Sequence, residues 1–105
     1  MDERVRQSLL FDFYGELLTP RQKQIFEEVV MNDLSLGEAA EEFGISRQGI
    51  HDMVRRCTAS MNSYESKLHL VETFLKIRRK AEEIKELSAQ EEVRQLADEI
   101  LREIE

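Results

Sequence analysis

Apolar residues recur three and four positions apart along most of this chain, and few turn-favouring residues interrupt them. Such spacing places side chains on one face of an α-helix. Only four Gly and one Pro occur among the 105 residues, too few for the many turns of a β-sandwich or barrel. The length suits one small domain with an extension. We therefore predict an all-α fold.

Two helices are expected before residue 35. The first is predicted over 3–18, and the second over 20–32, where Thr19 suits the N-cap and Pro20 suits the first helical position. The inward face of the first helix is expected to hold Val5, Leu9, Leu10, Phe13, Leu17 and Leu18. Aromatic residues at helical spacing in both helices are Phe11, Phe13, Tyr14 and Phe26. Core packing explains these aromatic residues best, with a partner-binding patch as the alternative.

Residues 36–55, LGEAAEEFGISRQGIHDMVR, fit the template of a helix-turn-helix, in which two short helices meet across a tight turn. Ala40 is the small residue where the helices touch, and Gly44 is the turn residue that tolerates a positive φ. Ser35, three residues before Glu38, and Ser46 are expected N-caps. The remaining apolar positions are filled by Ala39, Phe43, Ile45, Ile50 and Met53. An ordinary helical corner is the alternative.

The second helix of this motif carries polar residues opposite its apolar side. Arg47 and Gln48 fall in its first turn, which in recognition helices meets base edges in the major groove. Arg can bind guanine, and Gln adenine, through two hydrogen bonds. The candidate DNA-binding residues are Ser46, Arg47, Gln48, His51, Asp52, Arg55 and Arg56, with Arg21, Lys23 and Gln24 on the preceding helix.

The charge of the chain keeps a second interpretation open. The formal net charge is −7, and residues 1–62 hold 7 basic and 11 acidic residues. Glu38, Glu41 and Glu42 are expected to face solvent beside the turn and would repel phosphates. The same face can therefore be interpreted as a surface for protein or RNA.

Residues 63–105 are predicted to form a C-terminal helical hairpin after a helix-turn-helix domain over 1–62, with a bend near Asn62 and Ser63. A second capping box, Ser88 with Glu91, is expected to open the last helix. Two coiled-coil seams are candidates for dimerisation, formed by Leu70, Phe74, Ile77, Ala81 and Ile84, and by Val93, Ala97, Ile100 and Ile104. They can pair within one chain or between two, and we expect a homodimer because dimers read two half-sites.

Other chemistry finds little support in the sequence. His51 and Cys57 lie about 240° apart around a helix and cannot share a metal ion. Cys57 fits a core position. We expect no enzyme activity, metal or cofactor, since no glycine-rich phosphate loop or converging acid and base residues occur. The absence of a signal peptide, of a disulfide and of a long apolar stretch favours a cytoplasmic protein without membrane insertion.

Three strings, FDFYGELLTPRQ, DLSLGEAAEEFGISRQGIHDMVRR and YESKLHL, together resemble the YlxM family of small bacterial proteins. The likeness covers roughly residues 9–74. It implies a helix-turn-helix similar to sigma-factor region 4, which reads the −35 promoter element. It also implies a DNA-binding regulator encoded beside genes of the signal recognition particle pathway. The reading helix implied by the resemblance starts at Ser46 and includes Arg47, Gln48, His51 and Arg55.

Overall fold

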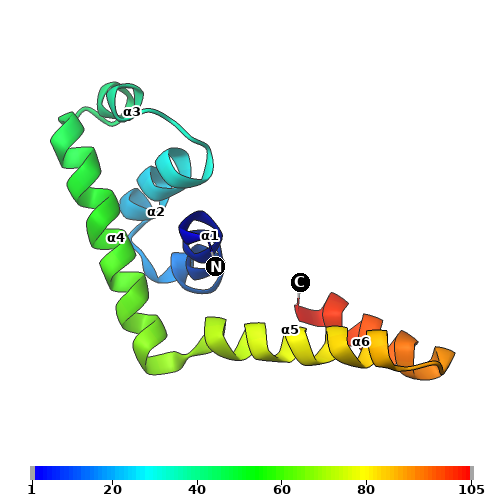
Figure 1. Ribbon diagram of the computed structural model, residues 1–105. Coiled ribbons are helices and arrows are strands. Elements are labelled where there is room, and N and C mark those ends of the chain that lie inside the picture. Colours follow the sequence, from blue (N-terminus) through cyan, green and yellow to red (C-terminus); the bar gives the residue numbers. More distant parts are fainter. Residues whose placement is uncertain (1, 105) are drawn as a thin grey trace. The chain divides into compact units, whose positions relative to one another are not determined.

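The computed structural model describes residues 2–104, and within this range the chain is all-α, as predicted (Figure 1). The chain divides into two compact units, of which the first ends at Leu68 and the second begins at His69. The first unit holds helices α1 (Glu3–Tyr14), α2 (Pro20–Phe26), α3 (Leu36–Phe43) and α4 (Arg47–Leu68). The second unit holds α5 (Leu70–Leu87) and α6 (Glu91–Ile104).

Helix α1 is shorter than predicted and buries a different stripe. It ends at Tyr14, and Gly15–Leu17 form a 3₁₀ turn. Leu10, Tyr14 and Leu18, each four residues from the next, are enclosed. The prediction that Val5, Phe13 and Leu17 face inward is wrong, because these three side chains are 38–57% exposed. At 100° per residue Val5 lies about 180° and Phe13 about 100° from Tyr14, so neither is on the buried stripe, and Leu17 belongs to the 3₁₀ turn.

Helix α2 begins as predicted, with a capping box between Thr19 and Gln22. It is regular only to Phe26, after which Glu27–Met31 form a π-helical turn closed by the N–H of Asn32 on the carbonyl of Glu27 at 3.0 Å. The ring of Phe26 stacks on that of Phe11, with centroids 5.2 Å apart. This contact joins α2 to α1 and places the aromatic side chain of Phe26 in the core, as predicted.

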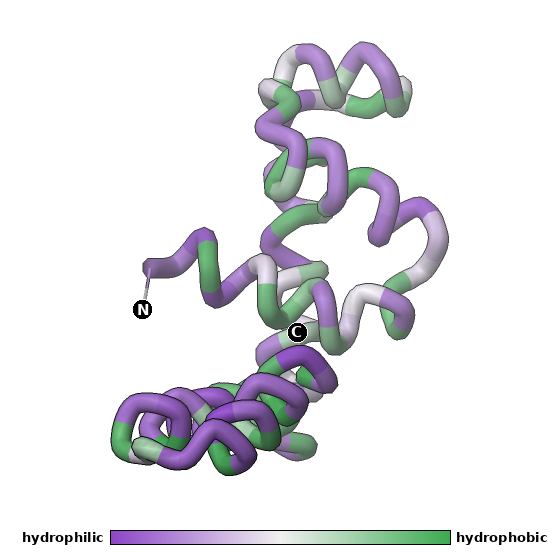
Figure 2. The backbone as a smooth tube through the Cα atoms, turned by 90° about the vertical axis from the view of Figure 1, so that its right-hand side faces the viewer, coloured by the Kyte–Doolittle hydropathy of each residue, from purple (hydrophilic) through white to green (hydrophobic). Residues whose placement is uncertain are grey.

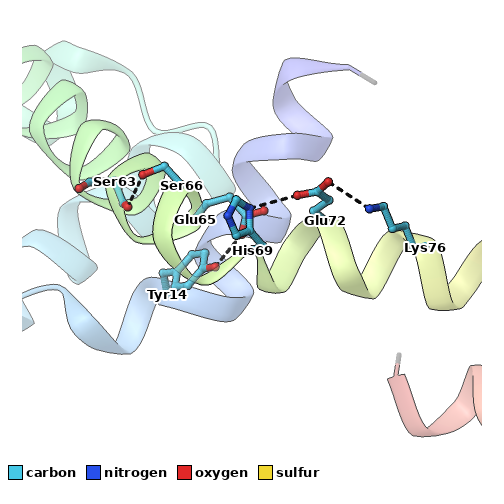
Figure 3. Close-up of polar contacts among 7 residues, drawn as sticks. All are labelled: Tyr14, Ser63, Glu65, Ser66, His69, Glu72 and Lys76. Carbon is cyan, nitrogen blue, oxygen red and sulfur yellow. Dashed lines mark hydrogen bonds and ion pairs between the residues drawn. The ribbon is translucent and has the colours of Figure 1, made fainter.

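Helix α4 runs unbroken through the polar stretch around Asn62 and Ser63, so the predicted bend there is wrong. Contacts with α1 keep this stretch helical. The hydroxyl of Tyr14 donates to Oε1 of the buried Glu65 at 2.6 Å (Figure 3), and Arg6 donates to Oδ1 of Asn62 at 2.7 Å. The backbone instead turns at His69, which has a φ of 54°.

Helices α5 and α6 form a hairpin joined at Ser88–Gln90, and in Figure 2, where the hairpin is seen nearly end-on, apolar segments are interspersed with hydrophilic ones. The predicted capping box of Ser88 with Glu91 is wrong, because α6 begins only at Glu91 and the Ser88 hydroxyl accepts from the N–H of Gln90. Ala81 and Ala97 are almost fully enclosed, and their small size allows a close approach of the helices. Lys85 and Asp98 form an ion pair of 2.8 Å between the helices.

Polar side chains at the start of α5 also contact one another. Glu72 contacts Nδ1 of His69 at 3.1 Å and Nζ of Lys76 at 3.2 Å (Figure 3). The hydrogen bond from Lys76 and its charge lower the pKa of the Glu72 carboxyl. These groups are exposed, so they add helical support of the usual i,i+3 and i,i+4 kind.

Candidate nucleic-acid interface

The turn between α3 and α4 has the geometry that the sequence predicts. Gly44 adopts the left-handed conformation, with φ 68° and ψ 33°, and its N–H donates to the carbonyl of Ala40. The N–H of Ile45 donates to the same carbonyl at 3.1 Å. Two capped helices flank the turn, because Ser35 and Glu38 form a capping box on α3 and Ser46 accepts from the N–H of Gly49 on α4. The orientation of α4 is therefore set by local hydrogen bonds on both sides of one glycine.

A small core fixes α4 against α2 and α3. Ile25, Ala39 and Ile50 are fully buried in one cluster. Half-buried apolar side chains pack around them: Val29, Leu34, Ala40, Phe43, Ile45, Met53 and Val54. Ala40 contacts this core as predicted, but the small residue that is completely enclosed is its neighbour Ala39. Helix α3 thus packs against the core of the motif through Ala39 and Ala40.

The opposite side of α4 presents the predicted polar residues to solvent. The side chains of Arg47, Gln48, His51 and Arg55 are exposed, and that of Asp52 is 46% exposed. We call the stripe formed by Arg47, Gln48, His51, Asp52 and Arg55 the α4 stripe. Because these residues are spaced at one, three and four positions, they share one helical face.

Asp52 organises the middle of the α4 stripe. Its Oδ1 accepts a hydrogen bond from Nε2 of Gln48 at 3.0 Å and lies 3.9 Å from Nδ1 of His51. One of the two N–H donors of the Gln48 amide is therefore engaged by Asp52. One turn further along, a surface hollow of about 330 Å³ is lined by Asp52, Arg55, Arg56 and Ala59. Two of its four lining residues, Arg55 and Arg56, are arginines.

The three candidate DNA-binding residues on α2 differ in the contacts that they make within the protein. Nη2 of Arg21 donates to the carbonyl of Phe43 at 3.0 Å and so closes the C-terminal end of α3. Lys23 pairs with Glu16. Gln24 is exposed. Arg21 thus has a structural role within the protein, in addition to the contact with the DNA backbone that the sequence predicts for it.

Gly37 is a residue that sequence reasoning missed. A Cβ built on Gly37 would lie 3.1 Å from Nη2 and 3.3 Å from Nε of Arg47. The guanidinium of Arg47 therefore rests on the backbone of α3 at a position without a side chain. No spacing rule links residues 37 and 47, so only the folded turn reveals the contact. Ala59, in contrast, follows Arg55 by four residues, and extending the stripe by one turn would have found it.

Three glutamates on α3 and the cysteine of α4 limit the chemistry available near the α4 stripe. Glu38, Glu41 and Glu42 are exposed on α3, as expected. Cys57 is completely buried, its thiol donates weakly to the carbonyl of Gln22 at 3.8 Å, and burial raises its pKa to about 11. The thiol therefore stays protonated at neutral pH and serves as a core side chain.

Residues 2–104 contain no group of three His, Cys, Asp or Glu side chains arranged to hold a metal ion. Over the same range, no helix combines the length and apolar character needed to cross a bilayer.

The candidate dimerisation residues on α5 and α6 separate into enclosed and exposed positions. Ala81 and Ala97 are buried within the hairpin. Phe74, Val93 and Ile104 are half-buried. Leu70, Ile77, Ile84 and Ile100 remain 40–43% exposed.

Two capped helices joined by a left-handed glycine, with a buried inner side and an exposed outer side on the second helix, define a helix-turn-helix protein. The chain belongs to the UPF0122 family, described as "Putative helix-turn-helix protein, YlxM / p13 like", whose model matches residues 1–100. The resemblance found in the sequence is thereby confirmed.

Relatives in several bacteria share most of the chain. A UPF0122 protein of a Thermoanaerobacter species is 41% identical across 99% of this chain and 95% of its own length. That of Oceanobacillus iheyensis is 47% identical across 70% of each chain. That of Bacillus thuringiensis is 40% identical across 88% of this chain and 84% of its own.

Proposed function

We propose that this protein is a DNA-binding regulatory protein whose helix α4 enters the major groove. The observation that carries the proposal is the α4 stripe. It is exposed on a helix whose other side is held in the core by Ile50. Residues 47–56 contain three Arg and one Asp, so this segment is basic within an acidic chain. A rigid basic helix that projects from a small core suits insertion into a groove about 12 Å wide.

In the proposed complex some residues contact base edges and others bind the phosphates of the DNA backbone. Arg47 and Gln48, in the first turn of α4, read base edges. Ser46, Arg55 and Arg56 bind phosphates, and the hollow beside the two arginines gives a phosphate group room. His51 and Asp52 border the reading residues. Arg21, Lys23 and Gln24 approach the backbone from α2, and Arg21 keeps four of its five N–H donors after its bond to Phe43.

We further propose that the protein works as a homodimer, does no covalent chemistry and acts in the cytoplasm. One α4 stripe offers few base contacts, whereas two copies read a symmetric site with half-sites about 34 Å apart. The dimer therefore supplies the affinity that a single small helix-turn-helix lacks.

Selection of bound sequences from random duplex DNA at moderate salt tests the proposal. We expect a symmetric motif, and we expect binding to weaken steeply as the salt concentration rises. Replacing Arg47 by Ala should cost about 1–3 kcal/mol and relax the preference at one base position. Arg79→Ala is the matched control, because Arg79 is an exposed arginine on α5 outside the stripe. Recovery of no motif, with both variants behaving like the parent, rejects the proposal.

A second candidate function is an adaptor that binds the protein or RNA of the signal recognition particle through the same face. The exposed carboxylates of Glu38, Glu41 and Glu42 beside the turn favour it, because they repel a DNA backbone and attract basic protein surfaces. Reversing the charges of Glu41 and Glu42 to Lys discriminates the functions, because it leaves Glu38 in place to cap α3. The variant should bind DNA more tightly if the first proposal holds, and should lose its partner if the second holds.

A further inference from the structure

The α5–α6 hairpin has two unlike faces. With about 100° per residue, Ile77 and Ile84 lie roughly 40–60° to one side of Ala81, while Lys85 lies to the other side. In α6, Val93 and Ile100 lie roughly 40–60° to one side of Ala97, and Asp98 lies to the other. Because the helices are antiparallel, the two apolar sides point to the same face of the hairpin, and the Lys85–Asp98 ion pair lies on the opposite face.

The apolar face is left open within the hairpin. Ile77 is 42% exposed, Ile84 43%, Leu96 60% and Ile100 40%. Leu70 and Ile77 are seven residues apart, as are Ile77 and Ile84, and Val93 and Ile100. This is the spacing of a coiled-coil seam that packs against further helices. A contiguous exposed apolar face on a small protein marks an interaction site.

Charges along the edges of the face identify its occupant. The outer edge of α5 carries the exposed Lys76, Lys80 and Glu83, whereas the outer edge of α6 carries the exposed Glu92, Glu99 and Glu103. Neither Lys80 nor Glu99 forms an ion pair among residues 2–104. The α5 edge therefore has a net positive charge and the α6 edge a net negative charge, so the face is complementary to a second copy of itself.

We propose that two copies of this chain pack these apolar faces together into a four-helix bundle, with α5 of each copy lying over α6 of the other. A two-fold axis parallel to the helices produces this arrangement. It brings Lys80 of one copy near Glu99 of the other, and Lys76 near Glu103, because the enclosed Ala81 and Ala97 set these residues at matching heights. The alternative two-fold axis, perpendicular to the helices, stacks α5 on α5 and places lysines opposite lysines.

The size of the face determines the strength of the dimer. Helix α5 has 18 residues and is about 27 Å long, and two adjacent helices are about 20 Å wide. Such a face buries roughly 500 Å² or somewhat more per copy, near the lower limit for a specific interface. The dimer should therefore dissociate measurably on dilution. The inference rests on the proposed function in one respect: the dimer supplies the second α4 helix that reads DNA. Self-association itself is measured without DNA.

Sedimentation equilibrium of the full chain over a wide concentration range tests the inference. We expect a reversible dimer, and Ile77→Glu should weaken it by at least about a hundredfold, since the change introduces two charges into the apolar seam. Arg79→Glu is the matched control. Arg79 is exposed on the same helix about 160° from Ala81, away from the apolar face, and its replacement should leave the dimer intact. Far-UV circular dichroism should show that both variants keep their helices.

Charge reversal tests the arrangement of the helices. Lys80→Glu and Glu99→Lys should each weaken the dimer about three- to tenfold, and the double variant should recover most of the loss. A monomeric parent chain overturns the inference without touching DNA recognition. A dimer that Ile77→Glu breaks, but whose double variant fails to recover, overturns the pairing of α5 with α6. Loss of DNA binding with an intact dimer overturns the proposed function alone.

Discussion

The helix-turn-helix unit and the C-terminal hairpin use the same apolar spacing but enclose different side chains. The first unit buries large ones, among them Leu10, Tyr14, Ile25, Phe26, Ile50 and Met61. Within the described part of the hairpin, the enclosed apolar residues are Val71, Ala81 and Ala97. In the first unit helices approach one another from several directions, whereas the second unit contains only α5 and α6, which pack on each other. An apolar stripe is therefore buried only as far as other helices surround it.

Polar contacts differ between the two regions in the same way. Tyr14 and Glu65 form a hydrogen bond in the interior of the first unit, where Tyr14 is 1% exposed. Lys85 and Asp98 form their ion pair at the surface of the hairpin, where both side chains are at least 40% exposed. Hydrogen bonds shielded from water are costly to lose, whereas exposed ion pairs contribute little. The first unit should therefore be the more sensitive of the two to substitution.

Truncation of core isoleucines should give the largest contrast. Ile50→Ala should destabilise the first unit by about 2–5 kcal/mol, because it leaves a cavity at a fully buried position. Ile84→Ala, at a 43% exposed position, should cost far less in dilute monomer. Urea unfolding measures both. Both tyrosines lie before Leu68, so tyrosine fluorescence reports on the first unit, while circular dichroism reports on all helices. Equal costs would contradict the contrast in packing.

Removal of one buried hydroxyl should have a smaller effect. Tyr14→Phe deletes the donor to Glu65 while keeping the ring, and should cost about 1–3 kcal/mol. Tyr64→Phe, whose ring lies 5.9 Å from that of Tyr14, is the control and should be nearly neutral. The remaining tyrosine in each variant reports unfolding by fluorescence. A neutral Tyr14→Phe would show that the buried hydrogen bond adds nothing to the first unit.

The turn glycine provides a prediction of still smaller size. Gly44→Ala should cost about 1–2 kcal/mol, because a side chain disfavours the left-handed backbone even though a Cβ there would meet nothing within 4 Å. Gly37→Ala should cost less, since its Cβ meets only the movable end of Arg47. Gly37→Ala should nevertheless alter DNA preference by displacing that guanidinium. Thermal unfolding with both variants separates backbone strain from side-chain crowding.

Acid titration should produce the smallest effect, confined to the hairpin. The hydrogen bond and charge of Lys85 lower the pKa of Asp98 below its ordinary value of 3.8. The pair therefore stabilises the hairpin fully above that pH, and the stabilisation is lost as the pH falls through the lowered pKa. Asp98→Asn should remove this dependence, which circular dichroism between pH 5 and pH 2 measures. An unchanged acid transition in the variant would show that the pair does not contribute.

Local signals in the sequence predicted the geometry of the turn between α3 and α4 well. The capping box at Ser35, the left-handed Gly44 and the start of α4 at Arg47 depend on neighbours within a few residues, and all three are confirmed. The exposed side of α4 follows from the helical repeat alone. The contact of Gly37 with Arg47 and the bond from Arg21 to Phe43 join residues ten or more positions apart, so no local pattern contains them.

The errors have a common cause. The polar stretch around Asn62 predicted a bend, but Arg6 and Tyr14 of α1 supply it with partners and α4 continues to Leu68. Likewise the spacing of Val5 and Leu17 from other apolar residues predicted their burial, yet their side chains are 50% and 57% exposed.

Amino-acid order alone determined that this chain is helical, where α3 and α4 begin, and which side of α4 is polar, because caps, glycines and helical spacing act over a few residues. Tertiary structure alone decided which apolar stripes are buried and where the long helix ends. Burial and the satisfaction of distant polar groups depend on which helices become neighbours, and that choice is made by the whole chain at once.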